Sequence, residues 1–548
     1  MVGPARPLRA AALGPRDRTE RSLSRFDVVV IGSGFGGAVV AARLALAGRS
    51  VCVLEQGRRW EPSQYPRSFS AAAGAVWDET DRRGFLDYRV FSRIDVVQGV
   101  GVGGGSLHYF NVQSRAPAAI LDRPEWPSAL HAGILDPYYA RVEGVTTPAP
   151  LVPPAGERLP RRTEAFLRAA GEAGYDASLR PIAIHTGPTR AHPISGLRQE
   201  PCAFTADCLI GCRPRSKNSL DVTYLPMGER HGLEIRPLHT ADGLEPASGG
   251  GYTVSVRRFD PDHPGAFERD QVTGTTVVVA AGVVGTTELL LRARDLHRTL
   301  PGLPTTLGRR FSANGDMLFA GTRDTAELID PCHGPSITVG AFVQNPGSRH
   351  VIQVQDLAYP AALTSMFDGT LPLPSRVRRL AHAASGYVHA AVDGRSFPAR
   401  SLLDGSFVPH FLPYLGMGTD AGNGRFRLDG RGRLRLDWDS TASAGMFVEM
   451  EDAMRNLSRA LHGRFVRSLP WRWPLRRLLT AHPLGGCVMS DSPGTGVVND
   501  RGEVWGHPGL FVTDASIVPG PLAVNPSLTI AALSERVAQW MIEGRELR

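Results

Sequence analysis

The chain has almost no lysine. Lys217 is the only one among 61 basic residues, so arginine carries nearly all of the positive charge. A net charge of +8 would suit a nucleic acid or an anionic membrane if the basic residues were clustered. The arginines are dispersed, and no nucleic-acid-binding motif accompanies them. We therefore interpret the charge as general surface charge and expect no nucleic-acid partner.

Long apolar segments are also missing. No run of about 18 apolar residues occurs, which excludes a transmembrane helix of ordinary length. Residues 1–25 contain arginines but no apolar core of a secretory signal, so we expect a disordered leader and a cytoplasmic protein. An interfacial patch of Trp471, Arg472, Trp473 and Arg476 would allow peripheral membrane contact, although a core-packed tryptophan pair is the favoured interpretation.

Cysteine is scarce, with six residues in 548, which argues against a disulfide scaffold. Cys202, Cys208 and Cys212 do cluster, and three close thiols could hold a metal or an iron–sulfur cluster. Their C-x5-C-x3-C spacing matches neither a zinc nor a ferredoxin pattern, and no fourth ligand is evident. We expect ordinary buried thiols and no metal site.

A nucleotide-binding pattern opens the ordered part of the sequence. Residues 26–31 (FDVVVI) form a short apolar run typical of a buried parallel strand. Gly32, Gly34 and Gly37 follow in a G-x-G-x-x-G fingerprint, then a helical pattern and a second strand ending at Glu55. This arrangement predicts a dinucleotide site, but by itself it does not separate FAD from NAD.

Each position in the fingerprint has a physical role. Gly32 permits the tight turn, Gly34 lets a pyrophosphate approach the backbone, and Gly37 allows close packing of helix and strand. The free N–H groups at the helix N-terminus then face the phosphates. Glu55 follows Gly34 by 21 residues, where an acceptor for the ribose hydroxyls is expected.

The length suits two domains. Residues 275–293 and 509–541 each read as a strand, a turn and a helix, and so return to the nucleotide-binding region. The hairpin pattern at 426–439 predicts an antiparallel substrate domain. We therefore predict an α/β fold in which a Rossmann-like domain is joined to an α+β domain. The expected spans are 1–25 for the leader, 26–315 for the nucleotide-binding domain, 316–474 for the substrate domain and 475–548 for the return.

Five segments resemble the glucose–methanol–choline (GMC) oxidoreductases. They are DVVVIGSGFGGAVVAARLALAG, GVGVGGGSLHYFNV, AAGVVGTTELLL, HPLGGCVMSD and LFVTDASIVPGPLAVNPSLTIAAL, and they occur in order along nearly the whole chain. LGMGTDAGNGRFRLDGRGRLRLDWD and KNSLDVTYL are similar to the bacterial cholesterol-oxidase branch. The resemblance implies an FAD enzyme that oxidises an alcohol.

The resemblance also implies cofactor contacts. Members of the family hold FAD non-covalently or through a histidine. The positions that match their cofactor-binding residues are Phe35, Gly36 and Glu55 for the adenosine diphosphate half, Gly103, Gly104 and Gly105 beside the isoalloxazine, and Asp514, Ala515 and Ser527 on its far side. His108 stands where some members attach the flavin covalently; the alternative is a histidine stacked near it. Tyr109 departs from the asparagine common in sterol-oxidase relatives, and Asn111 follows two residues later.

Two residues match the catalytic positions of the family. Oxidising an alcohol requires removal of a hydroxyl proton and a carbinol hydride, and the flavin takes the hydride. His482 in AHPLGGC suits the proton transfer, and the amide of Asn525 in VNPSLT can hold the substrate oxygen. Gln355, followed by Asp356, aligns with the glutamate that isomerises the steroid in cholesterol oxidases.

The leading hypothesis is an FAD-dependent oxidase or dehydrogenase acting on a bulky apolar secondary alcohol such as a sterol, with oxygen or another electron acceptor. An alternative is an alcohol dehydrogenase of secondary metabolism that uses an acceptor other than oxygen. A third hypothesis, from a different class, is a flavin-binding protein without catalysis. The presence of both His482 and Asn525 argues against this third hypothesis.

Overall fold

A computed structural model describes residues 24–68, 71–72, 74–131, 133–154, 156–343, 345, 347–363, 408–468 and 477–544. The patch predicted at Trp471, Arg472, Trp473 and Arg476 lies outside these residues, as does the predicted leader up to residue 23. Residues 24 and 25 already belong to the first strand. Within the described residues, no helix has both the length and the apolar character needed to span a bilayer.

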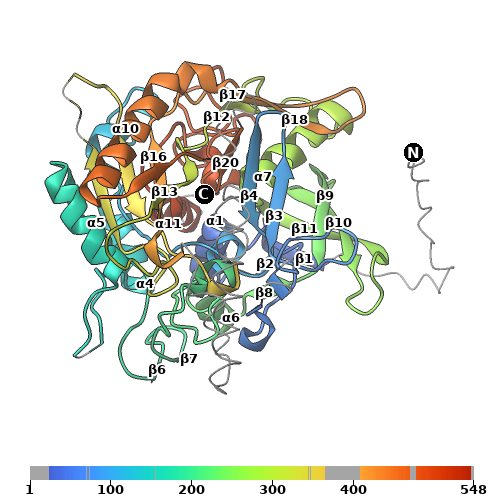
Figure 1. Ribbon diagram of the computed structural model, residues 1–548. Coiled ribbons are helices and arrows are strands. Elements are labelled where there is room, and N and C mark those ends of the chain that lie inside the picture. Colours follow the sequence, from blue (N-terminus) through green and yellow to red (C-terminus); the bar gives the residue numbers. More distant parts are fainter. Residues whose placement is uncertain are drawn as a thin grey trace, which may run out of the picture.

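The nucleotide-binding domain is built on a mostly parallel sheet (Figure 1). Strand β1 (Ser24–Ile31) lies between β2 (Val51–Leu54) and β11 (Phe267–Val279) and is parallel to both. β8 (Glu234–Arg236) extends the sheet beyond β2, and β21 (Leu510–Val512) pairs with β11. Val28, Val29 and Val30 are completely or almost completely buried, as expected for a central parallel strand.

Helices follow the strands at the same edge. Helix α1 (Phe35–Leu46) begins directly after the glycine turn, and α7 (Gly282–Leu291) follows β11. The strand, turn and helix predicted at 275–293 are therefore confirmed. β10 (Tyr252–Phe259) and β9 (His239–Pro246) add an antiparallel extension to β11.

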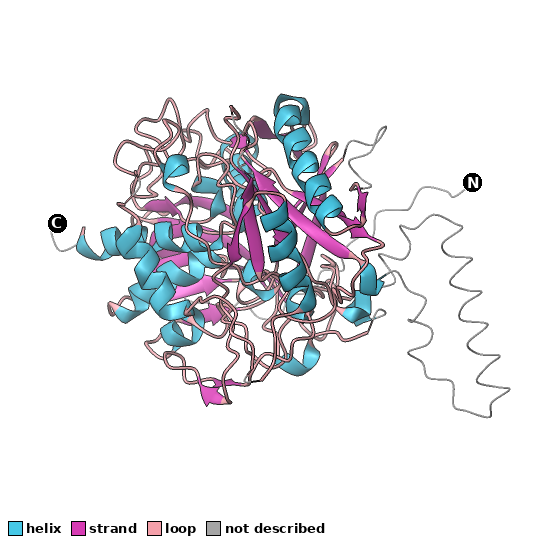
Figure 2. Ribbon diagram, turned by 60° about the vertical axis from the view of Figure 1, so that its left-hand side comes forward, coloured by secondary structure: helices cyan, strands magenta, loops and turns pink. Residues whose placement is uncertain are grey.

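A second sheet is antiparallel, which confirms the predicted fold class. Its strand order is β19 (Arg464–Val466), β13 (Met317–Arg323), β16 (Leu412–Gly418), β15 (Ile352–Asp356), β14 (Val339–Val343) and β5 (Asp176–Leu179). Helices α5 (Arg161–Glu172) and α10 (Ala444–Ala460) pack against one of its faces (Figure 2). There the ring of Phe166 contacts Tyr414 edge to face.

Two segments differ from the predicted division of the chain. α5 and β5 lie within the span predicted for the nucleotide-binding domain, but β5 pairs with β14 of the second sheet. The predicted hairpin exists as β17 (Gly424–Leu428) and β18 (Leu434–Asp437), but it pairs with β12 (Arg309–Phe311) in a small separate sheet. A local hairpin pattern does not reveal the third strand that the hairpin joins.

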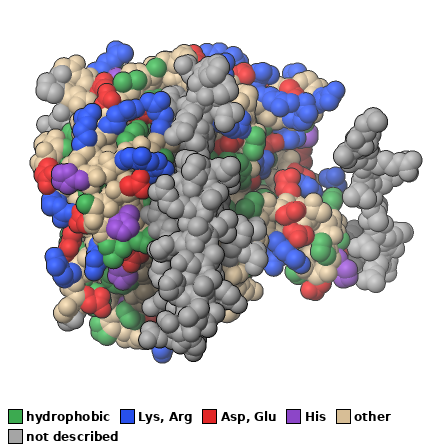
Figure 3. Space-filling view, in the orientation of Figure 1, with side chains coloured by type: hydrophobic (Ala, Val, Ile, Leu, Met, Phe, Trp, Pro, Cys, Tyr) green, Lys and Arg blue, Asp and Glu red, His purple; other side chains and the backbone are tan. Residues whose placement is uncertain are grey.

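A second small sheet leads to the residues just before His482. β4 (Ile94–Gly99) pairs with β3 (Leu86–Val90) and with β20 (Leu478–Thr480). Other α-helices and strands are α3 (Ala118–Leu121), α4 (Asp136–Thr146), α6 (Tyr224–Glu229), β6 (Arg190–Ala191) and β7 (Arg198–Gln199). On the face shown in Figure 3, basic side chains are spread among acidic ones.

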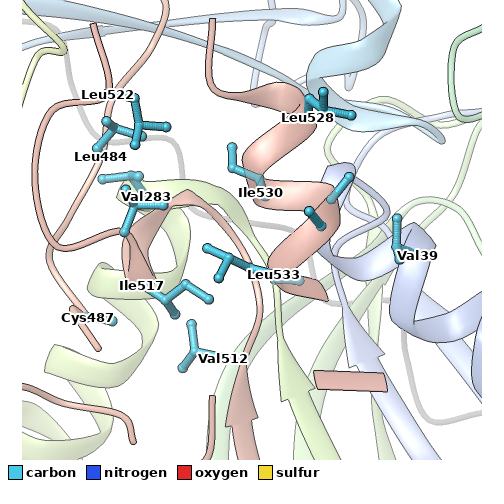
Figure 4. Close-up of a cluster of buried hydrophobic side chains, with 14 of the residues drawn as sticks. Val39, Val283, Leu484, Cys487, Val512, Ile517, Leu522, Leu528, Ile530 and Leu533 are labelled. Atoms are coloured by element: carbon cyan, nitrogen blue, oxygen red, sulfur yellow. The ribbon is translucent and has the colours of Figure 1, made fainter. Parts of the chain in front are cut away.

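The C-terminal helix α11 (Ser527–Glu543) packs against α1. Figure 4 shows the buried side chains around this contact: Val39 from α1, and Leu528, Ile530 and Leu533 from α11. The same cluster includes Val283, Leu484, Cys487, Val512, Ile517 and Leu522. The core therefore draws on segments that are hundreds of residues apart in the sequence.

Candidate active site

The fingerprint turn leaves room for a ligand on one side only. A Cβ atom on Gly36 would lie 1.6 Å from Thr513 O, and one on Gly37 would lie 2.1 Å from Gly32 O. These two glycines are required for packing within the protein. A Cβ atom on Gly34, in contrast, would meet no protein atom within 4 Å. The open space lies at the start of α1, where the helix N-terminus favours a phosphate.

A second glycine loop meets this turn. Gly101, Gly103 and Gly104 have φ angles of 125°, 113° and 51°, which a residue with a side chain rarely adopts. A Cβ atom on Gly104 would lie 2.6 Å from Gly34 Cα, so the two loops are in contact through glycine backbone. A Cβ atom on Gly105 would have His108 Nε2, at 3.9 Å, as its nearest neighbour. Together the loops form a cradle of the kind that a dinucleotide requires.

Glu55 ties the two loops together. Its Oε2 accepts hydrogen bonds from Ser33 N and Ser33 Oγ (3.1 and 2.7 Å), and its Oε1 accepts from Gly57 N and Gly101 N (2.9 and 3.0 Å). Burial raises the pKa of this carboxyl group, while the four hydrogen bonds oppose that shift. Its predicted contact with the ribose stays a prediction, because both oxygens already hold the cradle in shape.

Asp514 and Ala515 lie opposite the fingerprint turn. Asp514 Oδ2 accepts from Gly282 N (2.9 Å), and its Oδ1 accepts from Ser516 N (2.8 Å). Ala515 O accepts from Gly485 N (3.1 Å). Burial raises the pKa of Asp514, and its hydrogen bonds oppose this. These contacts hold the turn before α7 against the segment that leads to α11.

Further residues that the resemblance assigns to the cofactor, or places near it, also make contacts with one another and with neighbouring segments. The ring centroids of Phe35 and Tyr109 are 5.3 Å apart, in an edge-to-face arrangement. Ser527, the first residue of α11, donates to Val112 O (3.1 Å). Asn111 has a φ of 70°, its Nδ2 donates to a cysteine sulfur, and its Oδ1 has no hydrogen-bond partner among the described residues.

His482 is held by a carboxylate that the sequence analysis missed. Its Nδ1 lies 2.9 Å from Asp316 Oδ1. Asp316 Oδ2 accepts from Thr480 Oγ1 and Ala481 N, both at 2.9 Å, and from His482 N at 3.2 Å. Because Asp316 only accepts, Nδ1 carries a proton and the lone pair of the neutral ring is on Nε2. The side chain of Asp316 is fully buried, and that of His482 is 15% exposed.

Asn525 lies on the other side of the histidine ring. Its Nδ2 is 3.4 Å from His482 Nε2, and its Oδ1 accepts from Gln355 Nε2 at 2.8 Å. The structure therefore brings together His482, Asn525 and Gln355, three predicted residues from three distant segments. A base and an amide donor in contact can bind one hydroxyl oxygen between them.

One turn positions both side chains. Asn314 Oδ1 accepts from Leu522 N and Ala523 N (2.8 and 3.0 Å), and its Nδ2 donates to Val524 O (2.9 Å). Asn314 thus holds the loop that precedes Asn525, while Asp316 in the same turn holds His482. Asn314 itself has a φ of 54°, a conformation that asparagine tolerates.

Gln355 and Asp356 point to opposite sides of β15. Asp356 forms a fully buried ion pair with Arg162 and also accepts from Thr338 N and Val339 N (2.8 and 3.0 Å). Gln355 instead faces Asn525. Neighbouring strand residues alternate in direction, so Asp356 does not reach the site in this register.

The sheet face that carries Gln355 is otherwise apolar at the neighbouring positions of β16. Gln353 and Gln355 are paired directly with Met417 and Leu415 and so project to the same side. Met417 and Leu415 belong to a buried apolar cluster, separate from the main core, that also contains Val112, Leu151, Ile182, Phe204, Ile337 and Leu357. An apolar wall therefore adjoins the histidine and the amides.

Lys217 lies behind the glycine loop and is 2% exposed. Its Nζ donates to Leu107 O (2.8 Å), Cys208 O (3.0 Å) and Tyr109 O (3.5 Å), and thus holds the carbonyl groups on both sides of His108. His108 Nε2 has no hydrogen-bond partner among the described residues. Burial, followed by the electrostatic influence of the neighbouring Lys217 and His482, lowers the pKa of His108 from 6.5 to about 3.

The three clustered cysteines, Cys202, Cys208 and Cys212, form no disulfide bond. Cys208 Sγ accepts from Asn111 Nδ2 (3.0 Å), Cys212 Sγ lies 3.2 Å from Ser216 Oγ, and burial raises the pKa of Cys202 to about 12. In the described part of the chain, no group of three or more histidine, cysteine or acidic residues is arranged to hold a metal ion.

Comparison with known proteins agrees with this geometry. The GMC oxidoreductase family profile matches residues 423–534, and an FAD binding domain profile matches residues 27–77. Cholesterol oxidase from Mycobacterium tuberculosis is 28% identical over 95% of this chain and 92% of its own length. Cholesterol oxidase from Acinetobacter baumannii is 27% identical over 94% of each. A long-chain-alcohol oxidase of Arabidopsis thaliana is 24% identical over 94% of this chain and 67% of its own.

Solved structures share the fold at low sequence identity. Formate oxidase superposes with a TM-score of 0.64 and 15% identity, covering 96% of this chain and 99% of the other. Pyridoxine 4-oxidase superposes with a TM-score of 0.59 and 18% identity, covering 94% and 98%. The matched profiles, the full-length relatives and the glycine cradle lead to one assignment. The chain belongs to the GMC oxidoreductase family and is an FAD-dependent enzyme that acts on CH–OH groups.

Proposed function

We propose that this enzyme oxidises a bulky apolar secondary alcohol, with a 3-hydroxysteroid as the leading substrate class. The observation that carries the proposal is the group Asp316, His482 and Asn525 set beside the apolar wall of Leu415 and Met417. The cholesterol oxidases among the relatives support the same substrate class.

In this proposal His482 Nε2 takes the hydroxyl proton, because Asp316 keeps the other ring nitrogen protonated and oriented. The NH2 group of Asn525 donates to the substrate oxygen and holds the carbinol carbon in place. The bound flavin supplies the acceptor for the carbinol hydride. Loss of one proton and one hydride leaves a ketone.

The first experiment is a substrate screen on the purified protein. Sterols, long-chain alcohols, sugars and choline are each mixed anaerobically with the FAD-loaded enzyme, and bleaching of the flavin is followed; repeating the reaction in air separates an oxidase from a dehydrogenase. Rapid flavin reduction by sterols supports the proposal. Reduction by straight-chain alcohols but not by sterols would instead favour the activity named for the Arabidopsis relative.

A matched pair of glycine variants tests the cofactor site. Gly34→Val adds a side chain where no protein atom lies within 4 Å, so the protein should fold but bind little FAD. Gly36→Val adds one that collides with Thr513, so the fold itself should suffer. A yellow Gly34→Val protein with a full complement of FAD would show that the phosphates bind elsewhere.

A further inference from the structure

Three side-chain amides form a continuous chain that ends at the histidine. Gln355 Nε2 donates to Gln353 Oε1 and to Asn525 Oδ1, both at 2.8 Å, and Asn525 Nδ2 faces His482 Nε2 at 3.4 Å. Gln353 and Gln355 are completely buried, and Asn525 is 5% exposed. The chain joins β15 of the substrate sheet to Asn525, which lies two residues before the start of α11.

The direction of this chain depends on Asp316. The carboxylate accepts from two backbone N–H groups and a hydroxyl, so the Nδ1–H of His482 donates to it. A neutral ring then offers a lone pair at Nε2, and Asn525 must turn its NH2 group toward that lone pair. Its oxygen consequently points to residue 355 and needs a donor there.

Gln355 supplies that donor, and a carboxylate could not. An amide NH2 has two hydrogens, and Gln355 uses one for Gln353 and one for Asn525. An ionised carboxylate at this position would only accept. Asn525 would then turn its NH2 group toward residue 355 and its oxygen toward His482, an arrangement that suits only a protonated ring.

We propose that Gln355 is a positioning residue which, through Asn525, keeps His482 neutral and its Nε2 lone pair ready for the substrate hydroxyl. The inference rests on the proposed role of His482 as the base. Gln355 acts on the reaction only through Asn525. Whether residue 355 donates or accepts the hydrogen bond to Asn525 decides which of the two protonation states of His482 the site prefers.

The variant Gln355→Glu tests the direction of the hydrogen bond between residue 355 and Asn525. Glutamate and glutamine are nearly equal in size. Because Gln355 Oε1 has no hydrogen-bond partner among the described residues, the replacement changes mainly the donating atom. Gln355→Leu removes the donor altogether. Val354→Ala is the matched control, because Val354 is a buried residue on the opposite face of the same strand.

The primary measurement needs no substrate. The full-length, FAD-loaded enzyme is labelled with [13Cε1]histidine, the signal of His482 is identified by its loss in His482→Gln, and its titration is followed with pH. We expect the midpoint in Gln355→Glu to move upward by about one pH unit or more, equivalent to a tenfold stabilisation of the imidazolium. In Val354→Ala the midpoint should stay where it is in the wild type, whatever the loss of stability.

The second measurement is the pH dependence of anaerobic flavin reduction by an alcohol from the screen. In Gln355→Glu the rate of flavin reduction should reach its plateau only at a correspondingly higher pH. In Gln355→Leu the plateau rate should be about tenfold lower, because Asn525 is no longer held in its orientation. A second result also supports the proposal: the His482 midpoint in Gln355→Glu equals that of the wild type, while Gln355→Leu reduces its flavin slowly. A neutral glutamic acid at position 355 can donate to Asn525 as glutamine does.

Wild-type titration and wild-type plateau rates in both Gln355 variants would overturn the proposal. The same holds if both variants merely lose stability, as Val354→Ala does. If no alcohol reduces the wild-type flavin, the proposed function fails, but the titration of His482 still decides whether Gln355 sets the protonation state of this histidine.

Discussion

The two sides of strand β15 treat buried polar groups in opposite ways. On the side of α5, Asp356 is paired with Arg162 and accepts two backbone N–H groups. On the other side, Gln353 Nε2 and Gln355 Oε1 have no partner among the described residues, although both side chains are completely buried. Burial alone therefore does not mark the active site. On this strand, the face with incomplete hydrogen bonding is the face of the candidate site, as expected if a ligand supplies the missing partners.

The largest expected effect is on the α5 side of β15, where the buried charges of Asp356 and Arg162 are paired. Asp356→Ala leaves the Arg162 guanidinium buried without its counter-charge, and we expect a loss of about 3–5 kcal/mol in the free energy of unfolding. Urea unfolding measures this. The double variant Arg162→Met/Asp356→Leu should recover most of the loss. A stable Asp356→Ala single variant would abolish the distinction between the two faces.

The next effect is on chemistry rather than stability. His482→Ala or Asn525→Ala should slow flavin reduction by about 10²-fold or more, since each removes a group that handles the proton or the oxygen. FAD content should change little, because neither side chain belongs to the two glycine loops of the cradle. Flavin reduction at nearly the wild-type rate in both variants would place the chemistry elsewhere.

The same contrast recurs at the glycine loop, where Lys217 is fully paired and His108 is not. Because the folded protein holds the His108 proton more weakly (pKa about 3) than the unfolded chain does (6.5), acid favours unfolding. The full stability is present above pH 6.5, and about 2 kcal/mol should be lost by pH 5. In His108→Phe the fall between those pH values should be shallower. Identical slopes would show that folding does not lower the pKa of His108.

The smallest effect concerns the product. If a 3-hydroxy-5-ene steroid is oxidised, isomerisation should be poor, because Gln355 cannot take and return a carbon-bound proton. The main product should be the unconjugated 5-en-3-one, which absorbs weakly near the enone band, and Gln355→Glu should raise the conjugated fraction. Asp356→Asn should leave the product ratio unchanged. Conjugated product forming as fast as the flavin is reduced would contradict this assignment.

The sequence allowed the fold to be predicted where the signal is local. The glycine fingerprint and the motifs around His482 and Asn525 are contiguous, and these segments lie together in the structure as the resemblance implied. Asp316 was missed because its partner is 166 residues away and a lone aspartate in a turn carries no periodic signal. The direction of the Gln355 amide depends on contacts that no local pattern encodes. Lys217 could have been found from its isolation among arginines.

Lys217 has a practical consequence. With the only ε-amino group of the chain held against the carbonyl oxygens of Leu107 and Cys208, amine-directed reagents find no lysine on the native surface. A protease that cuts after lysine has a single site, and that site is closed while the glycine loop is in place. Cleavage after Lys217 in an otherwise folded molecule would therefore report local opening of the segments that carry Leu107 and Cys208.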